Sequence, residues 1–472
     1  MRSRRPKIKS DYSRSAIAKR WVLLLLPTRL SVFLFRTFID NNRERNALEA
    51  QKFLVDANKI YPTRLYSLLP KFLSFSFRLG CQSVSEQYLA SIKGSLMSTR
   101  RDPSQRSRIN SLTYQLTKQL EVQTMTAQSW KLLSLALGGF GLIRASTVAR
   151  ENCLSKALIE VEGGTASRRT IELAMRGLLE KQQLDKYKAL QKNLSEDVTQ
   201  ITAPPSHEIY MNLMSSKDFV QLGPAVKTRS SELDLFDEAV RDRVIALVAT
   251  GELSNNYGMM IDQSDSVART KFQGSATSSE PEKSGSRCDI SFYTQDLIDK
   301  FKLKSHCDPS DLNFLNSVKV VVAKTPTDFS FNSVAVRVIP ERAPVYLTTA
   351  TSGTLFLFDL LAAGPRKIKL YGFNFYSERN LYDSALLDFY STPGAYQGIG
   401  LPKNWFDLST HQRASATIAR GFIPHDPKSD FLFVKNLYEL SGLIDGTPEV
   451  LEILNLTADE YDMRLEEMLG DW

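Results

Sequence analysis

Apolar and polar residues follow two different patterns along this chain of 472 residues. From residue 46 to residue 197, apolar positions recur at spacings of three and four, which is typical of amphipathic helices. Prolines and glycines interrupt this pattern, most clearly at the glycine pairs 138–139 and 163–164. The first half of the chain is therefore predicted to be an all-α domain of six or seven helices.

A helical hairpin is the most distinct element of this all-α domain. Residues 130–157 form two apolar stretches with small residues where the two helices would meet. This arrangement resembles the antiparallel helix pairs of tetratricopeptide-type (TPR-like) solenoids. Helical arrays of that kind commonly act as adaptors. We therefore expect the domain to bind a partner or to position the second half of the chain at a membrane.

The pattern changes after an irregular stretch at residues 198–238, which we interpret as a linker because it contains Pro204-Pro205 and Gly223-Pro224. From residue 239 to residue 472, short β-branched runs alternate with helical stretches. Strands are predicted at residues 244–249, 288–293, 318–323, 345–349 and 368–371, and helices at 294–303, 352–363, 428–441 and 448–469. This alternation predicts an α/β domain with a mostly parallel sheet that is covered on both faces.

The formal net charge of +8 is concentrated at the amino terminus. Residues 2–20 contain eight Lys or Arg and a single acid, and an apolar run interrupted by Pro27 and Arg29 follows. A bilayer-spanning helix needs roughly 20 mostly apolar residues, so this run is not expected to span a membrane. Two interpretations of residues 1–45 stay open. Residues 1–36 attach to a membrane surface, where each cation contributes on the order of 1 kcal/mol, or the segment is a buried first helix behind a basic tail.

Two other uses of this segment are less favoured. Arg29 interrupts the apolar core that a signal peptide needs, and no small-residue cleavage site follows closely. The basic cluster has few interleaved aromatic residues on which bases would stack, so nucleic acid is not expected as a partner. We expect a cytoplasmic protein that lies at the periphery of the membrane.

Cysteine and histidine residues are sparse and scattered. The four cysteines lie far apart and form no CxxC pair, which predicts unpaired thiols in a reducing compartment. The four histidines form no HExxH motif or other short-spaced ligand set. A structural or catalytic zinc ion is therefore not expected. The α/β domain also has no convincing Asp-x-Asp pair that would hold another divalent ion, so no metal or other cofactor is expected.

Four segments of the α/β domain carry candidate chemistry, because parallel sheets bind ligands at the carboxyl ends of their strands. They contain Thr250 and Gly251; Arg269 and Lys271; Thr351, Ser352 and Gly353 together with Gly372, Asn374, Tyr376 and Tyr382; and finally His425 and Asp430. Each segment has a structural interpretation when it is taken alone. These are a tight turn, a salt-bridged loop, a helix N-cap, and a carboxylate that favours the dipole of the following helix.

The order of the four segments resembles that of the sialyltransferases. In that superfamily a strand-turn precedes a Val-x-Arg segment, a Thr/Ser-Gly helix and a Tyr-Gly-Phe strand, and a histidine with an acid five positions later comes last. The chain has these elements in the same order, and Tyr376 and Tyr382 stand where bacterial members place two tyrosines that hold the nucleotide phosphate. The chain departs from the family at Thr250 and at Lys271 or its neighbour Thr270, where asparagine is usual, and at Asn374, where the bacterial members have aspartate.

The resemblance implies a Rossmann-like nucleotide-sugar-binding fold and an inverting, metal-independent glycosyltransferase. The donor it implies is CMP-sialic acid or a related CMP-activated sugar, and the acceptor is a glycan or a lipid-linked sugar. His425 is implied as the general base, with Asp430 either orienting it or only favouring the helix dipole. The other residues of the four segments are implied to bind the nucleotide sugar. The alternative is a catalytically inactive helical-repeat scaffold whose second domain binds a nucleotide or a partner.

Overall fold

The computed structural model describes residues 106–139, 141–194, 204–215, 231–274, 280–295, 297–299, 301, 309–327, 331, 334–377 and 425–468. The predicted membrane-attachment segment, residues 1–45, and the predicted site residue Tyr382 lie outside these described residues. None of the helices within the described ranges is both long enough and apolar enough to cross a membrane.

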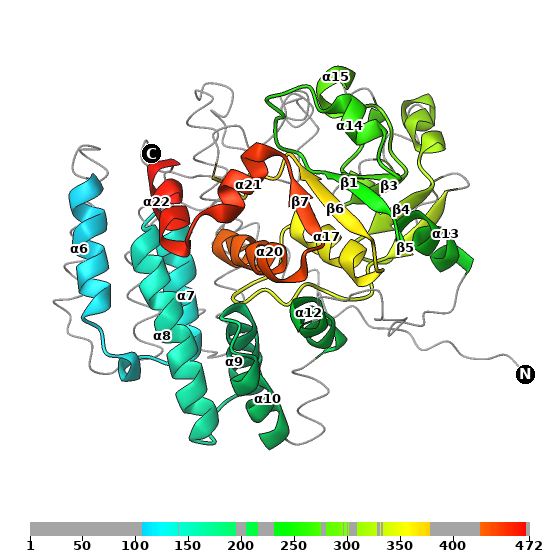
Figure 1. Cartoon of the computed structure of the whole chain (residues 1–472). Helices are drawn as coiled ribbons and strands as arrows, with labels where there is room; N and C mark the ends of the chain where they lie inside the picture. The colour runs from blue at the N-terminus through cyan, green and yellow to red at the C-terminus, as the bar shows by residue number, and fades with distance from the viewer. Residues whose placement is uncertain are drawn as a thin grey trace, which may run out of the picture.

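Seven parallel strands form one sheet at the centre of the α/β part (Figure 1). In chain order the strands are β1 (Val244–Val248), β2 (Ser266–Thr270), β3 (Ile290–Tyr293), β4 (Val320–Ala323), β5 (Ala335–Val338), β6 (Lys367–Tyr371) and β7 (Ile444–Gly446). Their order across the sheet is β5-β4-β3-β2-β1-β6-β7, and every neighbouring pair is parallel. The predicted α/β class with a parallel sheet is confirmed.

Four predicted strands correspond to β1, β3, β4 and β6, whereas the strand predicted at residues 345–349 is wrong. That buried segment is irregular, because Tyr346 and Leu347 pack against the helical part of the chain instead of joining the sheet. The sequence pattern does not predict β2, β5 or β7. The polar residues Ser266 and Arg269 obscure β2, although this strand is fully buried in the middle of the sheet.

Helices cover both faces of the sheet, as a parallel sheet requires. Ile245 and Leu247 of β1 face the largest core cluster, whereas Ala246 and Val248 face the opposite side. The first face is covered by α12 (Pro205–Ser215), α13 (Ser231–Val240), α17 (Ser352–Ala362), α20 (Pro427–Ser441), α21 (Pro448–Asn455) and α22 (Ala458–Met468), and the second by α14 (Gly258–Asp262), with α15 (Pro281–Ser284) beside it, and the 3₁₀ helix η5 (Pro309–Ser317). The single helix predicted at residues 448–469 is thus two helices, because Leu456 is extended.

The helical part begins, within the described residues, at α6 (Figure 1). It comprises α6 (Arg106–Lys118), the 3₁₀ helix η2 (Val122–Thr124), α7 (Ala127–Gly139), α8 (Ile143–Glu162), α9 (Arg168–Glu180) and α10 (Leu184–Asn193). The predicted hairpin corresponds to α7 and α8, which end at or beside the predicted glycine pairs. Where these helices meet, the Ser134 hydroxyl donates to Ser146 O (2.9 Å) and the Ser146 hydroxyl donates to Ser134 O (2.6 Å). Small side chains therefore bring the two backbones close together.

One hydrophobic core joins the helical part to the sheet. Met175 of α9 belongs to the same buried cluster as the residues of the strands. α12 lies in this core as well, with Tyr210 stacked on Phe433 of α20 at a centroid distance of 4.6 Å. The interpretation of residues 198–238 as an irregular linker is therefore wrong where α12 and α13 form. Pro205 starts a helix there, a position that proline favours.

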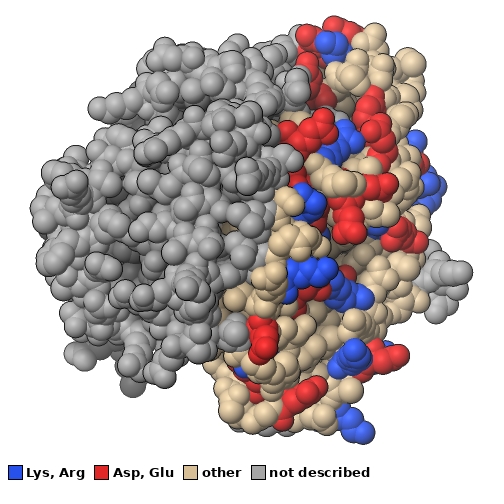
Figure 2. Space-filling view, turned by 90° about the vertical axis from the view of Figure 1, so that its left-hand side faces the viewer, with Lys and Arg blue, Asp and Glu red and all other residues tan. Residues whose placement is uncertain are grey.

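Charges on the described surface are mixed in sign. Figure 2 shows acidic and basic side chains interspersed over the described part of one face. Elsewhere, exposed pairs such as Arg168 with Glu172 and Arg241 with Asp237 lie one helical turn apart. Pairs of this kind each stabilise a helix by up to about 0.5 kcal/mol, so they contribute little to the fold compared with the core.

Replacing Leu213 by alanine tests whether α12 belongs to the core. Leu213 is fully buried, so Leu213→Ala is expected to lower the free energy of unfolding by about 2–5 kcal/mol. Glu208→Ala changes an exposed position of the same helix and is expected to alter it by less than about 0.5 kcal/mol. Chemical denaturation measures both values, and equal effects of the two substitutions would contradict the packing of α12.

Candidate active site

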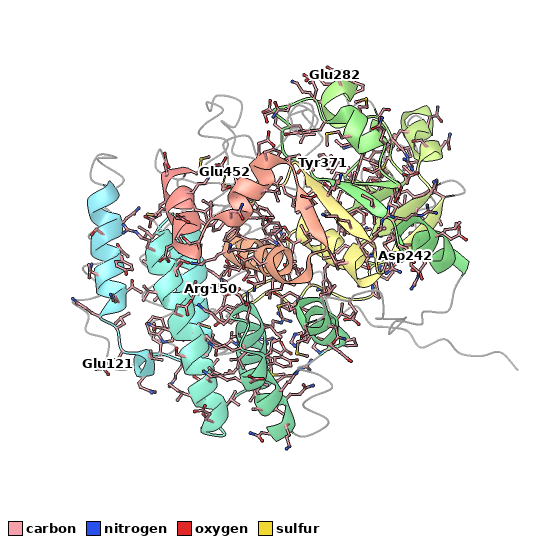
Figure 3. The ribbon with its side chains drawn as sticks, viewed as in Figure 1. Glu121, Arg150, Asp242, Glu282, Tyr371 and Glu452 are labelled. Atoms are coloured by element: carbon pink, nitrogen blue, oxygen red, sulfur yellow. The ribbon has the colours of Figure 1, made fainter. Side chains whose placement is uncertain are left out.

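A pocket lies at the carboxyl ends of β1 and β6, where the chain changes direction across the sheet. From β1 the chain adds β2 to β5 on one side, and it then crosses over to add β6 on the other side of β1. Ligands of parallel sheets bind at such switch points. Tyr371, labelled in Figure 3, is the last residue of β6 and marks this edge of the sheet.

Three strand ends and two helix starts line the pocket. Of the thirteen predicted site residues, eleven line it: Thr250, Gly251, Lys271, Thr351, Ser352, Gly353, Gly372, Asn374, Tyr376, His425 and Asp430. Five further residues line it. Thr270 and Phe373 belong to the segments that resemble the sialyltransferases, whereas Ala249, Thr354 and Phe375 have no sequence signal that separates them from ordinary core residues. Segments that are far apart in the sequence are therefore gathered around one space.

Arg269 stands apart from the other predicted residues that the structure describes. It is buried within β2, where Nε donates to Arg287 O at 2.7 Å and Nη2 donates to Ser284 O at 2.6 Å. Its side chain therefore holds the segment after α15 against the sheet. Arg269 therefore does not line the pocket, unlike the other predicted site residues that the structure describes.

The floor of the pocket is made of backbone. Gly251 N donates to Gly372 O at 3.1 Å, so the turns after β1 and β6 touch directly. A Cβ atom on Gly251 would lie 2.4 Å from Gly372 O, which is too close for any other residue to fit without a shift of the backbone. Gly372 itself has a positive φ of 66°. Both glycines are therefore required for the close approach of the two turns.

Left-handed backbone conformations are concentrated around this pocket. Among the described non-glycine residues, five have a positive φ, and Lys271 (61°), Phe375 (46°) and Tyr376 (62°) are three of them. All three line the pocket. Such conformations are strained for residues with a Cβ, and they cluster at binding and catalytic sites, where the surrounding structure enforces them.

Helix α22 enforces the turn after β6. The Tyr461 hydroxyl donates to Phe375 O, and Arg464 Nε donates to Ser377 O at 3.0 Å. Within the turn, Tyr376 N donates to Asn374 Oδ1 at 3.2 Å. These bonds fix the place of Tyr376 at the edge of the pocket. Sequence reasoning has no signal for Tyr461, because it is a buried residue of an ordinary amphipathic helix.

His425 directly precedes α20 and has a defined tautomer. Its Nδ1 lies 2.9 Å from Thr349 O. A carbonyl oxygen can only accept a hydrogen bond, so Nδ1 carries the proton when the imidazole is neutral. Nε2 is then left with the lone pair, which is the arrangement that a general base needs.

The surroundings of His425 keep its imidazole neutral. Burial lowers its pKa to about 4, and the positive charges of Lys324 and Lys271 act in the same direction, while the hydrogen bond to Thr349 opposes them. At neutral pH the ring is therefore uncharged and able to accept a proton.

Asp430, on the first turn of α20, is also buried. Its two carboxyl oxygens share the single hydrogen bond that Thr351 N donates, at N···O distances of 3.0 and 3.2 Å. Burial raises the pKa of Asp430 to about 7. Asp430 and His425 both bind the backbone of the segment before α17. Asp430 accepts from Thr351 N, and His425 Nδ1 donates to Thr349 O, so the two residues are connected through this segment.

Hydrogen-bond donors are frequent among the residues that line the pocket. They include the hydroxyls of Thr250, Ser352 and Tyr376, the ammonium group of Lys271, and the start of the eleven-residue helix α17. Such a set suits an anionic, oxygen-rich ligand such as a phosphate. Within the described ranges, no three His, Cys, Asp or Glu side chains are grouped so that they could hold a metal ion.

Comparisons with protein-family models and with curated proteins identify no relative of this chain. No protein-family model matches it, and no curated protein is significantly similar to it in sequence. The geometry of the pocket and the order of the motif residues are therefore the basis for the function proposed below.

Replacing Lys271 by methionine tests the electrostatic coupling in the pocket. Lys271 lowers the pKa of His425, so Lys271→Met is expected to raise that pKa, although burial keeps it below the usual value near 6.5. Lys271→Arg keeps the positive charge and is expected to leave the pKa close to that of the wild type. NMR titration of labelled histidine measures both, and a fall of the pKa in Lys271→Met would contradict this arrangement.

Replacing Asp430 by asparagine tests its raised pKa. Because the folded state keeps the proton up to about pH 7 whereas an unfolded aspartate loses it near pH 4, wild-type stability falls as the pH rises between these values. The loss is up to about 1.4 kcal/mol per pH unit. Asp430→Asn still accepts a bond from Thr351 N and is expected to lack this slope. Denaturation curves at several pH values measure the difference, and parallel profiles of the two proteins would refute the assignment.

Proposed function

We propose that the chain is an inverting, metal-independent glycosyltransferase that moves sialic acid or a related sugar from a CMP-activated donor to a glycan or lipid-linked acceptor. The convergence of the motif residues on one pocket, at the switch point of a parallel sheet, is the observation that carries this proposal. The sialyltransferase-like order of these residues along the chain supports the choice of donor.

His425 supplies the base in this proposal. The acceptor hydroxyl oxygen attacks the anomeric carbon of the sugar, and His425 Nε2 takes the hydroxyl proton as the new C–O bond forms. The bond between the anomeric carbon and the phosphate oxygen breaks, and CMP leaves with the electron pair. One displacement of this kind inverts the configuration at the anomeric carbon.

The departing CMP phosphate gains negative charge, and the donor-rich wall of the pocket is suited to stabilise it. Ser352 and Gly353 lie on the first turn of α17, where backbone N–H groups have no partner within the helix. The Tyr376 hydroxyl and Lys271 add a phenol donor and a positive charge. Preorganised donors of this kind stabilise developing charge without a metal ion.

An anionic donor would also prepare the base. A pKa of about 4 makes His425 a weak base in the free protein, and the two lysines contribute to that value. A bound phosphate would offset their positive charge and raise the pKa of the imidazole toward neutrality. His425 therefore becomes a stronger base when the CMP-sugar is bound, which is when it has to accept the proton of the acceptor hydroxyl.

Replacing His425 by alanine tests the catalytic role. Loss of a general base is expected to slow release of CMP from CMP-sialic acid in the presence of acceptor by about 10²–10⁴-fold. CMP itself is expected to bind as before, because His425 acts on the acceptor. Transfer is followed in buffer that contains EDTA, since no metal is required by the proposal.

The binding control for this experiment is the thermal shift caused by CMP, since a ligand of the folded state raises its apparent stability. Equal transfer rates of the wild type and His425→Ala would refute the role of His425. CMP binding without any transfer by the wild type would instead favour the inactive, nucleotide-binding scaffold.

A further inference from the structure

A buried ionic cluster lies behind the pocket, where the helical part meets α20. Arg150 of α8 pairs with Glu180, the last residue of α9, and with Asp426, the N-cap of α20. Its Nη2 also donates to Ser429 Oγ at 2.8 Å. All four residues are at most 9% exposed. Figure 3 labels Arg150 on α8, close to α20.

Asp426 connects this cluster to the candidate base. Its Oδ1 accepts from Lys428 N at 3.1 Å and from Ser429 N at 3.2 Å, while its Oδ2 pairs with Arg150. One carboxylate thus caps α20 and anchors it to α8. His425 is the neighbouring residue in the chain, so the same contacts fix the backbone from which its imidazole projects.

Arg150 also contacts the segment that contains Thr349, the hydrogen-bond partner of His425. Its guanidinium carbon lies 4.9 Å from the centre of the Tyr346 ring, and the Tyr346 hydroxyl donates to Arg150 O at 3.4 Å. Tyr346 is three residues before Thr349, whose carbonyl oxygen bonds to His425 Nδ1. Both partners of that hydrogen bond therefore belong to segments that rest on Arg150.

Stability by itself does not account for this cluster. Removing an arginine and two carboxylates from water opposes their mutual attraction, and apolar replacements of buried ion pairs often leave stability unchanged or increase it. The contacts of Arg150 are directional, however, because its planar guanidinium group has donors in fixed positions. The cluster is therefore better suited to fixing geometry than to adding stability.

We propose that Arg150 is a positioning residue that, through Asp426 and Tyr346, holds the hydrogen bond between His425 Nδ1 and Thr349 O and so keeps Nε2 available as the proton acceptor. This inference rests on the proposed function of His425 as a base. The proposal means that α8 and α9 help to position the candidate base, in addition to any role of the helical part in binding a partner or a membrane.

Arg150→Met in the full-length protein tests the proposal. NMR of ¹⁵N-labelled histidine reports the tautomer and the pKa of His425, and His425→Ala identifies its signals. Arg144→Met is the matched control, because Arg144 also lies on α8 and forms an ion pair across an interface, with Glu466 of α22 at 3.0 Å. Circular dichroism and the CMP thermal shift show whether each variant folds and binds.

Arg150→Met is expected to mix the two tautomers of His425 and to move its pKa from the wild-type value. It is also expected to lower kcat about 10- to 100-fold with little change in the KM of the donor, because a small misplacement of a catalytic group is sufficient for such a loss. Arg144→Met is expected to leave all of these quantities unchanged. A folded Arg150→Met protein whose His425 signals match those of the wild type would overturn the proposal.

If Arg150→Met does not fold, Ser429→Ala decides the question. This variant removes only the hydroxyl that joins Arg150 to Asp426 and Glu180, and a change in the His425 tautomer supports the proposal while unchanged signals overturn it. The imidazole signals need no turnover. A wild-type protein without transferase activity therefore counts against the proposed function and leaves this test of positioning valid.

Discussion

Parallel pairing places β1 between β2 and β6, and the site depends on this arrangement. The chain leaves β1 toward one edge of the sheet and later returns to form β6 on the other side of β1. The contact of the turns after β1 and β6 at Gly251 and Gly372 closes the floor of the space between them. A pocket at this place follows from the strand order itself, before any side chain is considered.

The side chains of the pocket then depend on a second layer of contacts. α22 holds the turn that carries Tyr376, and α8 holds the N-cap of α20 beside His425. A further buried pair, Lys428 with Asp462 at 2.6 Å, joins α20 to α22, with the Thr147 hydroxyl of α8 also bonded to Asp462. The helical part is thus in direct polar contact with the elements that line the pocket.

Burial shifts the two ionisable groups before and within α20 in opposite directions. It lowers the pKa of His425 and raises that of Asp430, because in each case the low dielectric disfavours the charged form. Hydrogen bonds to the backbone of residues 349–351 then give each group a fixed orientation. The imidazole is thus neutral at neutral pH, the carboxyl group is only partly ionised there, and Lys271 is the one lysine or arginine among the described residues that line the pocket.

The sequence by itself determined the class of the fold and most of the pocket. Continuous apolar runs such as residues 244–249 are buried between two layers of helices, and a glycine or a hydroxyl directly after such a run lies at the ligand-binding edge of the sheet. The order of the four polar segments, which resembles that of the sialyltransferases, then predicted eleven of the residues that line the pocket. The sequence pattern did not predict β2, because Ser266 and Arg269 are polar and interrupt the apolar run that is typical of a buried strand.

Only the tertiary structure decided how the pocket is held. Residues 345–349 have the composition of a strand, but contact with α8 uses their apolar side chains instead. Asp430 follows His425 closely in the sequence, yet its carboxyl group accepts a hydrogen bond from Thr351 N, which lies far away along the chain. Arg150 and Tyr461 have no local signal at all. Their roles arise from contacts between residues that are far apart along the chain, and a local pattern carries no information about such contacts.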